Sequence, residues 1–220
     1  MTGPEMVIQW KNDFDVLASG AAPGFEDSEI YSMLNRAYDS LILNLYKAKD
    51  WTTLQALIND VSYTSSVSVS QGDSVFSYPL PGFSGDTNSP FWLYVDSYST
   101  VTRSAIPNTG FIQSLASNSP MEISNMEVDI TDFKDLTVTV FNPMTIFKNP
   151  YVNLNSNQLN VVVDSYTTLT GISFIYVRKF LPISATQSCE LQESLHKTVV
   201  ALAVEFARKA INIKEPQSQK

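Results

Sequence analysis

The chain has 220 residues, enough for one large domain or two small ones. Its net charge is −8, and only Arg103 and Lys134 are basic between residues 61 and 147. Tight binding to duplex DNA needs clustered Lys and Arg to displace counterions, so the charge argues against that class of protein. Only 16% of the residues are charged, and Ser, Thr, Asn and Gln supply most of the polar surface, which suits β-structure and extended contact surfaces.

Cysteine usage and hydropathy exclude further classes of protein. Cys189 is the only cysteine, which excludes an intramolecular disulfide and a thiolate zinc site, and we expect it to be a small packed residue. The sequence shows neither a secretory signal nor an apolar run of ~18 residues that would span a membrane. We therefore expect a protein that is made in the cytosol and has no membrane contact.

The first 26 residues are predicted to form an irregular N-terminal arm. Gly20, Pro23 and Gly24 interrupt any continuous helix there, although Trp10 and Phe14 offer aromatic side chains for packing.

A strong helical pattern begins at residue 27, with Asp27 or Ser28 as the expected N-cap. One apolar stripe recurs at helical spacing: Ile30, Leu34, Ala37, Leu41 and Leu45. A second set widens it: Met33, Tyr38, Ile42 and Tyr46. So wide a surface predicts burial on two sides, one against the chain's own core and one against a neighbouring subunit. A shorter helix is expected over 51–58, capped near Asp50 or Thr52.

The middle of the chain has strand patterns. Alternating or β-branched runs occupy residues 63–70, 91–98, 136–141, 159–164 and 172–178. A short helix is expected at 111–116. These segments predict a β-rich domain of about five to seven strands.

A final helix is expected to start near Ser188, with one apolar stripe: Leu191, Leu195, Val199, Leu202, Phe206 and Ala210. The economical arrangement packs the terminal helices together. The predicted fold class is therefore α+β, with terminal helices packed together and an inserted antiparallel β-rich domain. The expected parts are an arm at 1–26, a helical layer at 27–60 and 188–213, a β-rich domain at 61–187, and a tail at 214–220.

The sequence offers little for catalysis. His196 is the only histidine, no G-x-S-x-G elbow surrounds a serine, and no phosphate-binding glycine loop occurs. The acidic segment 122–135 carries Glu127, Asp129, Asp132 and Asp135 but no glycine for a calcium loop, so we interpret it as a solvated edge. We expect no catalytic residue, no cofactor and no metal site, and we expect that the chain is not an enzyme.

Four segments resemble a known family. They are the helix at 28–46 (SEIYSMLNRAYDSLILNLY), the pattern FNPMTIFKNPYV at 141–152, and ISFIYVRKFLPIS at 172–184 followed by CELQESLHKTVVALAVEFA at 189–207. Their succession resembles structural proteins of crAss-like short-tailed bacteriophages, in particular the ring proteins stacked below the portal. One departure is that Phe180 stands where relatives often carry Pro, and the proline comes at Pro182.

The resemblance implies a virion subunit at the head–tail interface. Such subunits form a ring, commonly a dodecamer, that extends the DNA channel and docks the portal and other ring or tail proteins. DNA passes through the lumen without specific binding, which an acidic chain permits. The resemblance lends no catalytic residues.

The residues expected at subunit interfaces are Tyr31, Tyr38, Ile42, Tyr46, Trp92 and His196. One alternative is a head-decoration, cargo or fibre-associated virion protein. Another is a carbohydrate-binding or carbohydrate-processing β-domain that uses Trp92 and the acidic segment.

Overall fold

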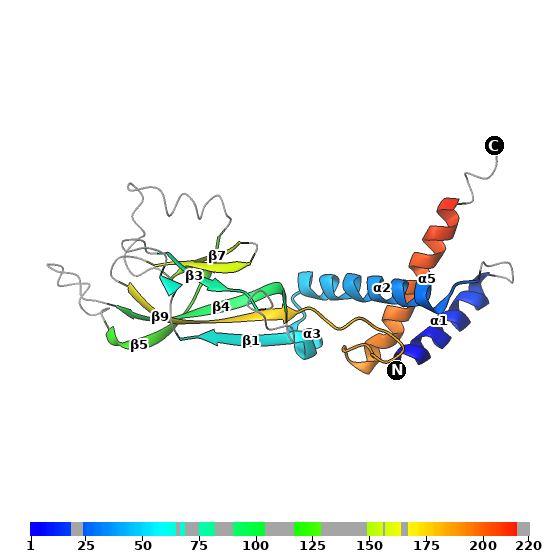
Figure 1. Cartoon of the computed structure of the whole chain (residues 1–220), viewed down its shortest axis with the longest axis horizontal. Coiled ribbons are helices and arrows are strands. Elements are labelled where there is room, and N and C mark those ends of the chain that lie inside the picture. The colour runs from blue at the N-terminus through cyan, green and yellow to red at the C-terminus, as the bar shows by residue number, and fades with distance from the viewer. Residues whose placement is uncertain are drawn as a thin grey trace. The chain divides into compact units, whose positions relative to one another are not determined.

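A computed structural model describes residues 1–18, 24–64, 67–68, 75–81, 90–103, 117–128, 149–155, 157–163 and 167–214. The chain divides into two compact units. The helical unit combines Met1–Ile58 with Phe180–Lys220, and the β unit is Asn59–Lys179. Figure 1 shows helices towards both ends of the chain and strands in its middle. This confirms the predicted α+β class, with packed terminal helices and inserted antiparallel β-structure.

Three long helices build the helical unit: α1 (Gly3–Ala18), α2 (Asp27–Lys47) and α5 (Glu193–Lys214). A one-turn helix α3 (Trp51–Leu54) and a 3₁₀ turn η1 (Gln55–Leu57) follow α2. Helix α5 packs against both α1 and α2. Their common core is made of buried apolar side chains: Met6, Trp10, Phe14, Ile30, Leu34, Tyr38, Ile42, Val199, Val200, Ala203 and Ala207.

Helix α1 corrects the prediction of an irregular arm at the N-terminus. Its start is a capping box, in which the Thr2 amide donates to the Glu5 carboxylate (2.7 Å) and the Glu5 amide donates to the Thr2 hydroxyl (3.4 Å). The hydrogen bond from the Thr2 amide lowers the pKa of Glu5. Pro4 lies in the first turn of α1. Backbone N–H groups in the first turn have no partner within the helix, so the N–H that proline lacks is not needed there. The residues that suggested irregularity all follow the last residue of the helix.

Apolar spacing also explains α1. Met6, Val7, Trp10 and Phe14 are buried and lie on one face. The Trp10 ring stacks on Phe14 with centroids 4.8 Å apart, and both rings meet the edge or face of Phe25 at 5.4 Å. This aromatic cluster joins the end of α1 to the start of α2.

The caps of α2 and α3 differ in how well they were predicted. The N-cap of α2 is Glu26, one residue before the expected pair, and its amide donates to the Glu29 carboxylate (3.0 Å). Asp50 caps α3 as predicted, accepting from the amide (3.2 Å) and the hydroxyl (2.7 Å) of Thr53.

Helix α5 begins at Glu193, five residues later than the expected start at Ser188. The face it buries also differs from the predicted stripe. Val199 is buried as expected, and so is Leu191, which precedes the helix. The rest of the buried face of α5 is His196, Val200, Ala203, Val204 and Ala207. Leu195, Leu202 and Phe206 are only partly buried, and Ala210 is exposed.

Two sheets build the β unit, with strand orders β1-β9-β4-β5 and β2-β3-β8-β7-β6. The first contains β1 (Ile58–Tyr63), β4 (Phe91–Arg103), β5 (Ser117–Ser124) and β9 (Thr167–Arg178). The second contains β2 (Val67–Ser68), β3 (Val75–Pro79), β6 (Met126–Glu127), β7 (Tyr151–Asn155) and β8 (Gln158–Val162). Strand β4 pairs antiparallel with β5 and β9, β8 pairs antiparallel with β3 and β7, and β6 and β7 are parallel.

Three expected strands correspond to β4, β8 and β9. The expected strand at 136–141 and the expected helix at 111–116 lie outside the described residues, and so does most of the segment 64–70.

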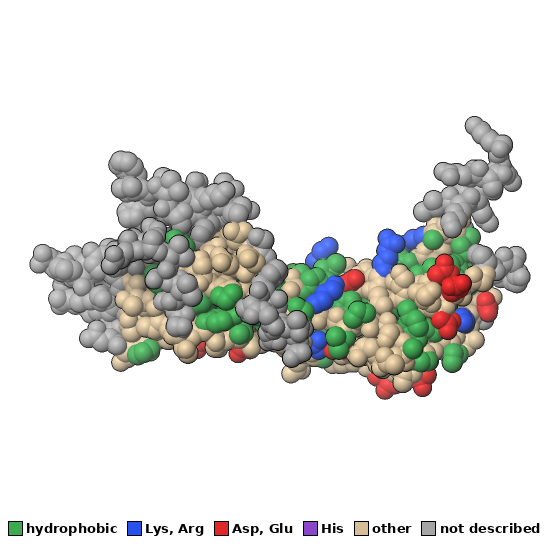
Figure 2. All heavy atoms as spheres, in the orientation of Figure 1, with side chains coloured by type: hydrophobic (Ala, Val, Ile, Leu, Met, Phe, Trp, Pro, Cys, Tyr) green, Lys and Arg blue, Asp and Glu red, His purple; other side chains and the backbone are tan. Residues whose placement is uncertain are grey.

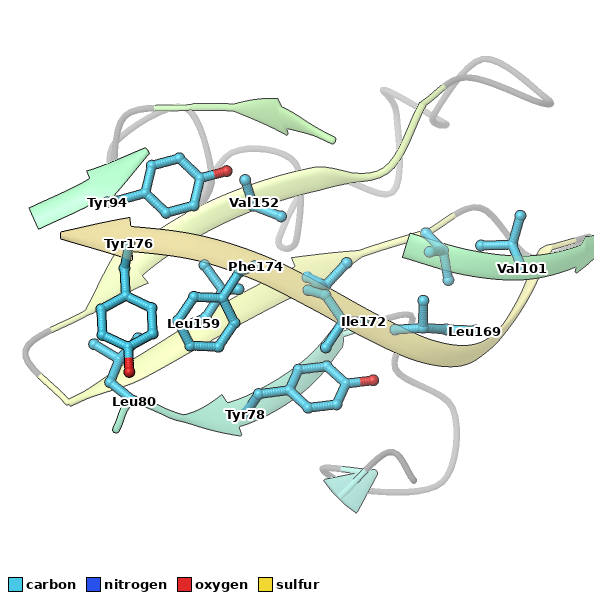
Figure 3. Packing of buried hydrophobic residues seen from close by; sticks show 12 residues of the cluster. Tyr78, Leu80, Tyr94, Val101, Val152, Leu159, Leu169, Ile172, Phe174 and Tyr176 are labelled. Atoms are coloured by element: carbon cyan, nitrogen blue, oxygen red, sulfur yellow. The ribbon is translucent and has the colours of Figure 1, made fainter. Parts of the chain in front are cut away.

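One apolar core joins the two sheets. Its buried side chains come from β3, β4, β7, β8 and β9, and Figure 3 shows them between the strands. Phe174 is fully buried and stacks near Tyr63 and Tyr176, with centroid distances of 6.0 and 5.6 Å. The sheets are therefore held by an aromatic and aliphatic layer to which both contribute.

A polar network lies inside this core. Ser97 is fully buried, and its hydroxyl is 2.7 Å from the Tyr94 hydroxyl and accepts from the Asn125 side-chain amide at 2.8 Å. The Asn125 backbone amide also donates to the Ser97 carbonyl (3.0 Å). Within the described part of the chain, the Ser99 hydroxyl, the Asn125 Oδ1 atom and the Tyr78 hydroxyl are buried without a hydrogen-bond partner.

Candidate functional site

The interface residues expected on the helices separate by burial. Tyr38 and Ile42 are fully buried, and His196 is 5% exposed. All three are therefore core residues of the single chain, with no surface left for another subunit. Tyr31 and Tyr46 are half-buried, so part of each side chain remains available for a contact. The surface of interest on α2 is thus the part outside its buried stripe.

Tyr38 holds the segment that leads from the β unit into α5. Its ring lies 4.0 Å from that of Phe180, centroid to centroid, and its hydroxyl accepts from the Glu190 amide at 3.2 Å. Burial raises the pKa of Tyr38 well above its ordinary value, and burial also raises the pKa of the nearby Cys189 thiol. Cys189 is buried as expected and is a free thiol.

Asn35, about one turn before Tyr38 on the same side of α2, fixes the same segment. Its side-chain amide donates to the carbonyls of Tyr31 (2.9 Å) and Ile183 (3.0 Å), and its carbonyl accepts from the Ile183 amide (2.7 Å). The Leu181 amide donates to the Glu190 carboxylate (2.8 Å). Sequence reasoning missed this clamp, because the two partners are 148 positions apart.

The start of α1 also lies on this segment. A Cβ atom added to Gly3 would meet the backbone carbonyl oxygen of Ser184. Glycine is therefore required at this close approach of two backbones.

His196 has a packing role. Its Nε2 atom is 2.9 Å from the Leu191 carbonyl oxygen, which can only accept, so Nε2 carries the proton. Nδ1 then accepts, and it lies 3.0 Å from the amino group of Met1. That amino group also pairs with the Glu193 carboxylate at 3.2 Å. The imidazole thus bonds both to the start of α5 and to the start of the chain.

Helix α5 has apolar side chains on more of its circumference than the described residues bury. Beside the buried face runs a partly exposed stripe that contains Leu195, Leu202 and Phe206. The guanidinium of Arg36, an exposed residue of α2, lies 5.3 Å from the centre of the Phe206 ring. On α2, Leu43 is 37% exposed. The outer surface of α2 and α5 therefore combines apolar and basic side chains.

Acidic side chains gather where α1 ends and α2 begins. We call this surface, formed by Asp13, Asp15, Glu26, Asp27 and Glu29, the acidic corner. Lys11 pairs with Asp27 at 2.7 Å and offsets one of its charges. Figure 2 shows red side chains at this end of the helical unit and blue side chains along another edge.

Trp92 lies in the β unit, on β4, and is half-buried. The Lys179 ammonium is 4.3 Å from the centre of its ring, which is cation–π geometry. The other predicted interface residues belong to the helical unit, so Trp92 is not brought together with them by either unit's own packing. Met126 on β6, 48% exposed, is the large exposed apolar side chain of the described β unit.

The acidic segment 122–135 is described only as far as residue 128. Glu122 and Glu127 are exposed there, whereas Asp129, Asp132 and Asp135 lie outside the described residues. Among the residues that the structure places, no three His, Cys, Asp or Glu side chains come together as metal ligands. Within the same residues, no helix is both long and apolar enough to cross a membrane.

Comparison with known protein families found none that matches this chain. A search of curated proteins likewise found no match.

Proposed function

We propose that the chain is a virion structural subunit that assembles with copies of itself into a ring between portal and tail. The ring would lie at the head–tail interface of a short-tailed bacteriophage, extend the DNA channel and dock other tail components. The resemblance of the segments at 28–46, 141–152, 172–184 and 189–207 supports this family of roles.

The observation that carries the proposal is the apolar surplus of α5. Val199, Val200 and Ala203 are fully buried, yet Leu202 and Phe206 on the neighbouring face are only partly covered. A helix that is apolar around most of its circumference is normally buried on most of it. A subunit that meets copies of itself on its helical unit would complete that burial.

The inserted β unit supports a second kind of contact. A ring within a stack needs surfaces for the layers above and below it as well as for its lateral neighbours. The β unit supplies a separate compact body with its own core and with partly exposed apolar residues such as Met126 and Trp92. The net charge of −8 suits a channel through which DNA slides without binding.

Light scattering of the purified chain over a range of concentrations tests the proposal. We expect a mass of many subunits and ring-shaped particles in negatively stained electron micrographs. A compact trimer would favour the head-decoration alternative instead. A mass of one subunit, 24.5 kDa, at every concentration tested would contradict self-assembly.

A further inference from the structure

We propose that lateral assembly joins the acidic corner of one copy to a basic face on the helical unit of the next copy. The basic face consists of Arg36 on α2 and Leu202, Phe206 and Lys209 on α5. The inference rests on the proposed function, because it names the surfaces through which the ring would close.

The basic face is both charged and apolar. Arg36 and Lys209 are exposed, while Leu202 and Phe206 are partly buried beside them. Arg36 lies in the middle of α2, where the helix dipole gives no preference for a cation. Its contact with the Phe206 ring places a cation beside an aromatic side chain that the described residues bury only partly. This mixture of an aromatic anchor and an arginine is typical of the centre of a protein interface.

The acidic corner contains a charge that its own helix disfavours. Asp15 lies in the last turn of α1, next to the negative end of the helix dipole, and no basic residue is present in that turn. The first turn of α2 adds Asp27 and Glu29 to the same region. Local stability does not explain an aspartate at the end of α1, whereas a basic partner surface does.

The two surfaces are separate patches of one chain with opposite sign. At 1.5 Å per residue along α2, Arg36 is roughly 13 Å from Asp27. Among the described residues, the ion pairs of the helical unit join Met1 to Glu193 and Lys11 to Asp27, and neither joins the acidic corner to the basic face. Complementary patches that lie apart on the same chain make a heterologous, head-to-tail contact. Such a contact forms a ring when its rotation closes, and the occupant of the basic face is therefore a second copy of this chain.

Charge reversal gives a direct test of this pairing. The first variant carries Arg36→Glu and Lys209→Glu, and the second carries Asp13→Lys and Asp15→Lys. A matched control carries Lys47→Glu and Lys197→Glu, which make the same charge change at exposed positions of α2 and α5 outside the basic face. Circular dichroism first establishes that all three are folded.

Sedimentation velocity at ~50 mM and ~300 mM salt then measures self-association. We expect each reversal variant alone to associate at least tenfold more weakly than wild type, with the control unchanged. The two variants mixed together should associate again, because each contact then pairs opposite charges, and a chain carrying all four substitutions should associate alone. Higher salt should weaken wild-type association.

Two results would overturn the inference. In the first, both reversal variants associate as strongly as wild type. The ring proposal would then stand, but these two surfaces would not form its contact. In the second, wild type binds a labelled 30-base-pair DNA duplex, and the Arg36→Glu, Lys209→Glu variant loses this binding but still self-associates. The basic face would then be a nucleic-acid site. Strictly monomeric wild type would contradict the proposed function itself.

Discussion

The helical unit and the β unit differ in the polar side chains that their cores contain. The helical core is almost entirely apolar, with His196 as its buried polar side chain among the described residues. The β core, in contrast, buries Ser97, Ser99 and Asn125 beside its aromatic residues. The helices satisfy their own backbone, so apolar faces suffice to join them. In the sandwich, buried hydrogen bonds help to select one strand register, since a slipped register would leave them unpaired.

The difference teaches where each unit is vulnerable. Loss of apolar packing or of a close backbone approach should affect the helical unit most. Loss of a single buried hydrogen bond should affect the β unit. Hydrogen–deuterium exchange read separately over the two units distinguishes these effects, because each unit has its own set of protected amides.

The largest expected effect tests the apolar helical core. Leu34→Asp places an unpaired charge at a fully buried position, and we expect a loss of about 4 kcal/mol or more in the free energy of unfolding. Leu202→Asp, on the partly exposed face, should cost about 1 kcal/mol or less. Urea denaturation measures both. Equal losses would show that Leu202 belongs to the core and that its face has no spare apolar surface.

A smaller effect tests the close approach at the start of α1. Gly3→Ala should lower the free energy of unfolding by about 2 kcal/mol, because the new methyl group meets the Ser184 carbonyl and one backbone must move. Gly24→Ala is the matched control, since its added methyl group would meet no atom within 4 Å. Exchange should increase over α1 in the first variant alone. Unchanged exchange there would mean that α1 is held mainly by its aromatic cluster.

Two serines of β4 offer a matched pair in the β core. Ser97 and Ser99 are both fully buried, but only the Ser97 hydroxyl has a hydrogen-bond partner among the described residues. Ser97→Ala should cost about 1–3 kcal/mol, because it removes the hydroxyl that hydrogen-bonds to the Asn125 side-chain amide and to the Tyr94 hydroxyl. Ser99→Ala should be neutral or slightly stabilising. Thermal denaturation compares them, and a reversed order would contradict the network.

The smallest effect at neutral pH concerns Tyr78. Burial raises its pKa to about 12 from an ordinary value near 10, because the phenolate is disfavoured in the core. The folded state therefore holds this proton more tightly, and the resulting stability is present below pH 10 and lost as the pH rises through about 12. Tyr78→Phe should be near wild type at pH 7, because the hydroxyl is buried without a partner in the described structure.

Alkaline denaturation measures this last change. Between pH 10 and pH 12, the Tyr78→Phe variant should lose less stability than wild type. A parallel decline in the two proteins would show that other ionisations dominate, such as that of Tyr63, whose pKa is also raised by burial.

Local patterns predicted elements well and long-range contacts poorly. The helix with the apolar stripe from Ile30 to Leu41 was predicted correctly, and so were the strands β4, β8 and β9. In each, the spacing of apolar residues along the sequence reflects which side chains are buried. Helix α1 was not predicted, although two signals in the sequence indicate a helix there. They are the Thr2–Glu5 capping box and the helical spacing of Met6, Trp10 and Phe14. The buried face of α5 was misplaced because two apolar faces competed, and only packing against α1 and α2 decides between them.

The candidate contact surface shows the same limit. Tyr38, Ile42 and His196 were predicted to contact a neighbouring subunit, but they are buried within the single chain. The Asn35 clamp and the pairing of Arg36 with Phe206 join residues far apart in sequence, and no local pattern encodes such a contact.

The discontinuous helical unit also has a consequence for synthesis on the ribosome. Helix α2 emerges long before α5, and the chain between Lys47 and Glu193 takes roughly 7–30 s to make at ~5–20 residues per second. During that interval the apolar stripe around Leu34 has no α5 to cover it. The β unit, whose strands all precede α5, can fold first, so a nascent chain passes through a stage in which its middle is native and its beginning still awaits its end.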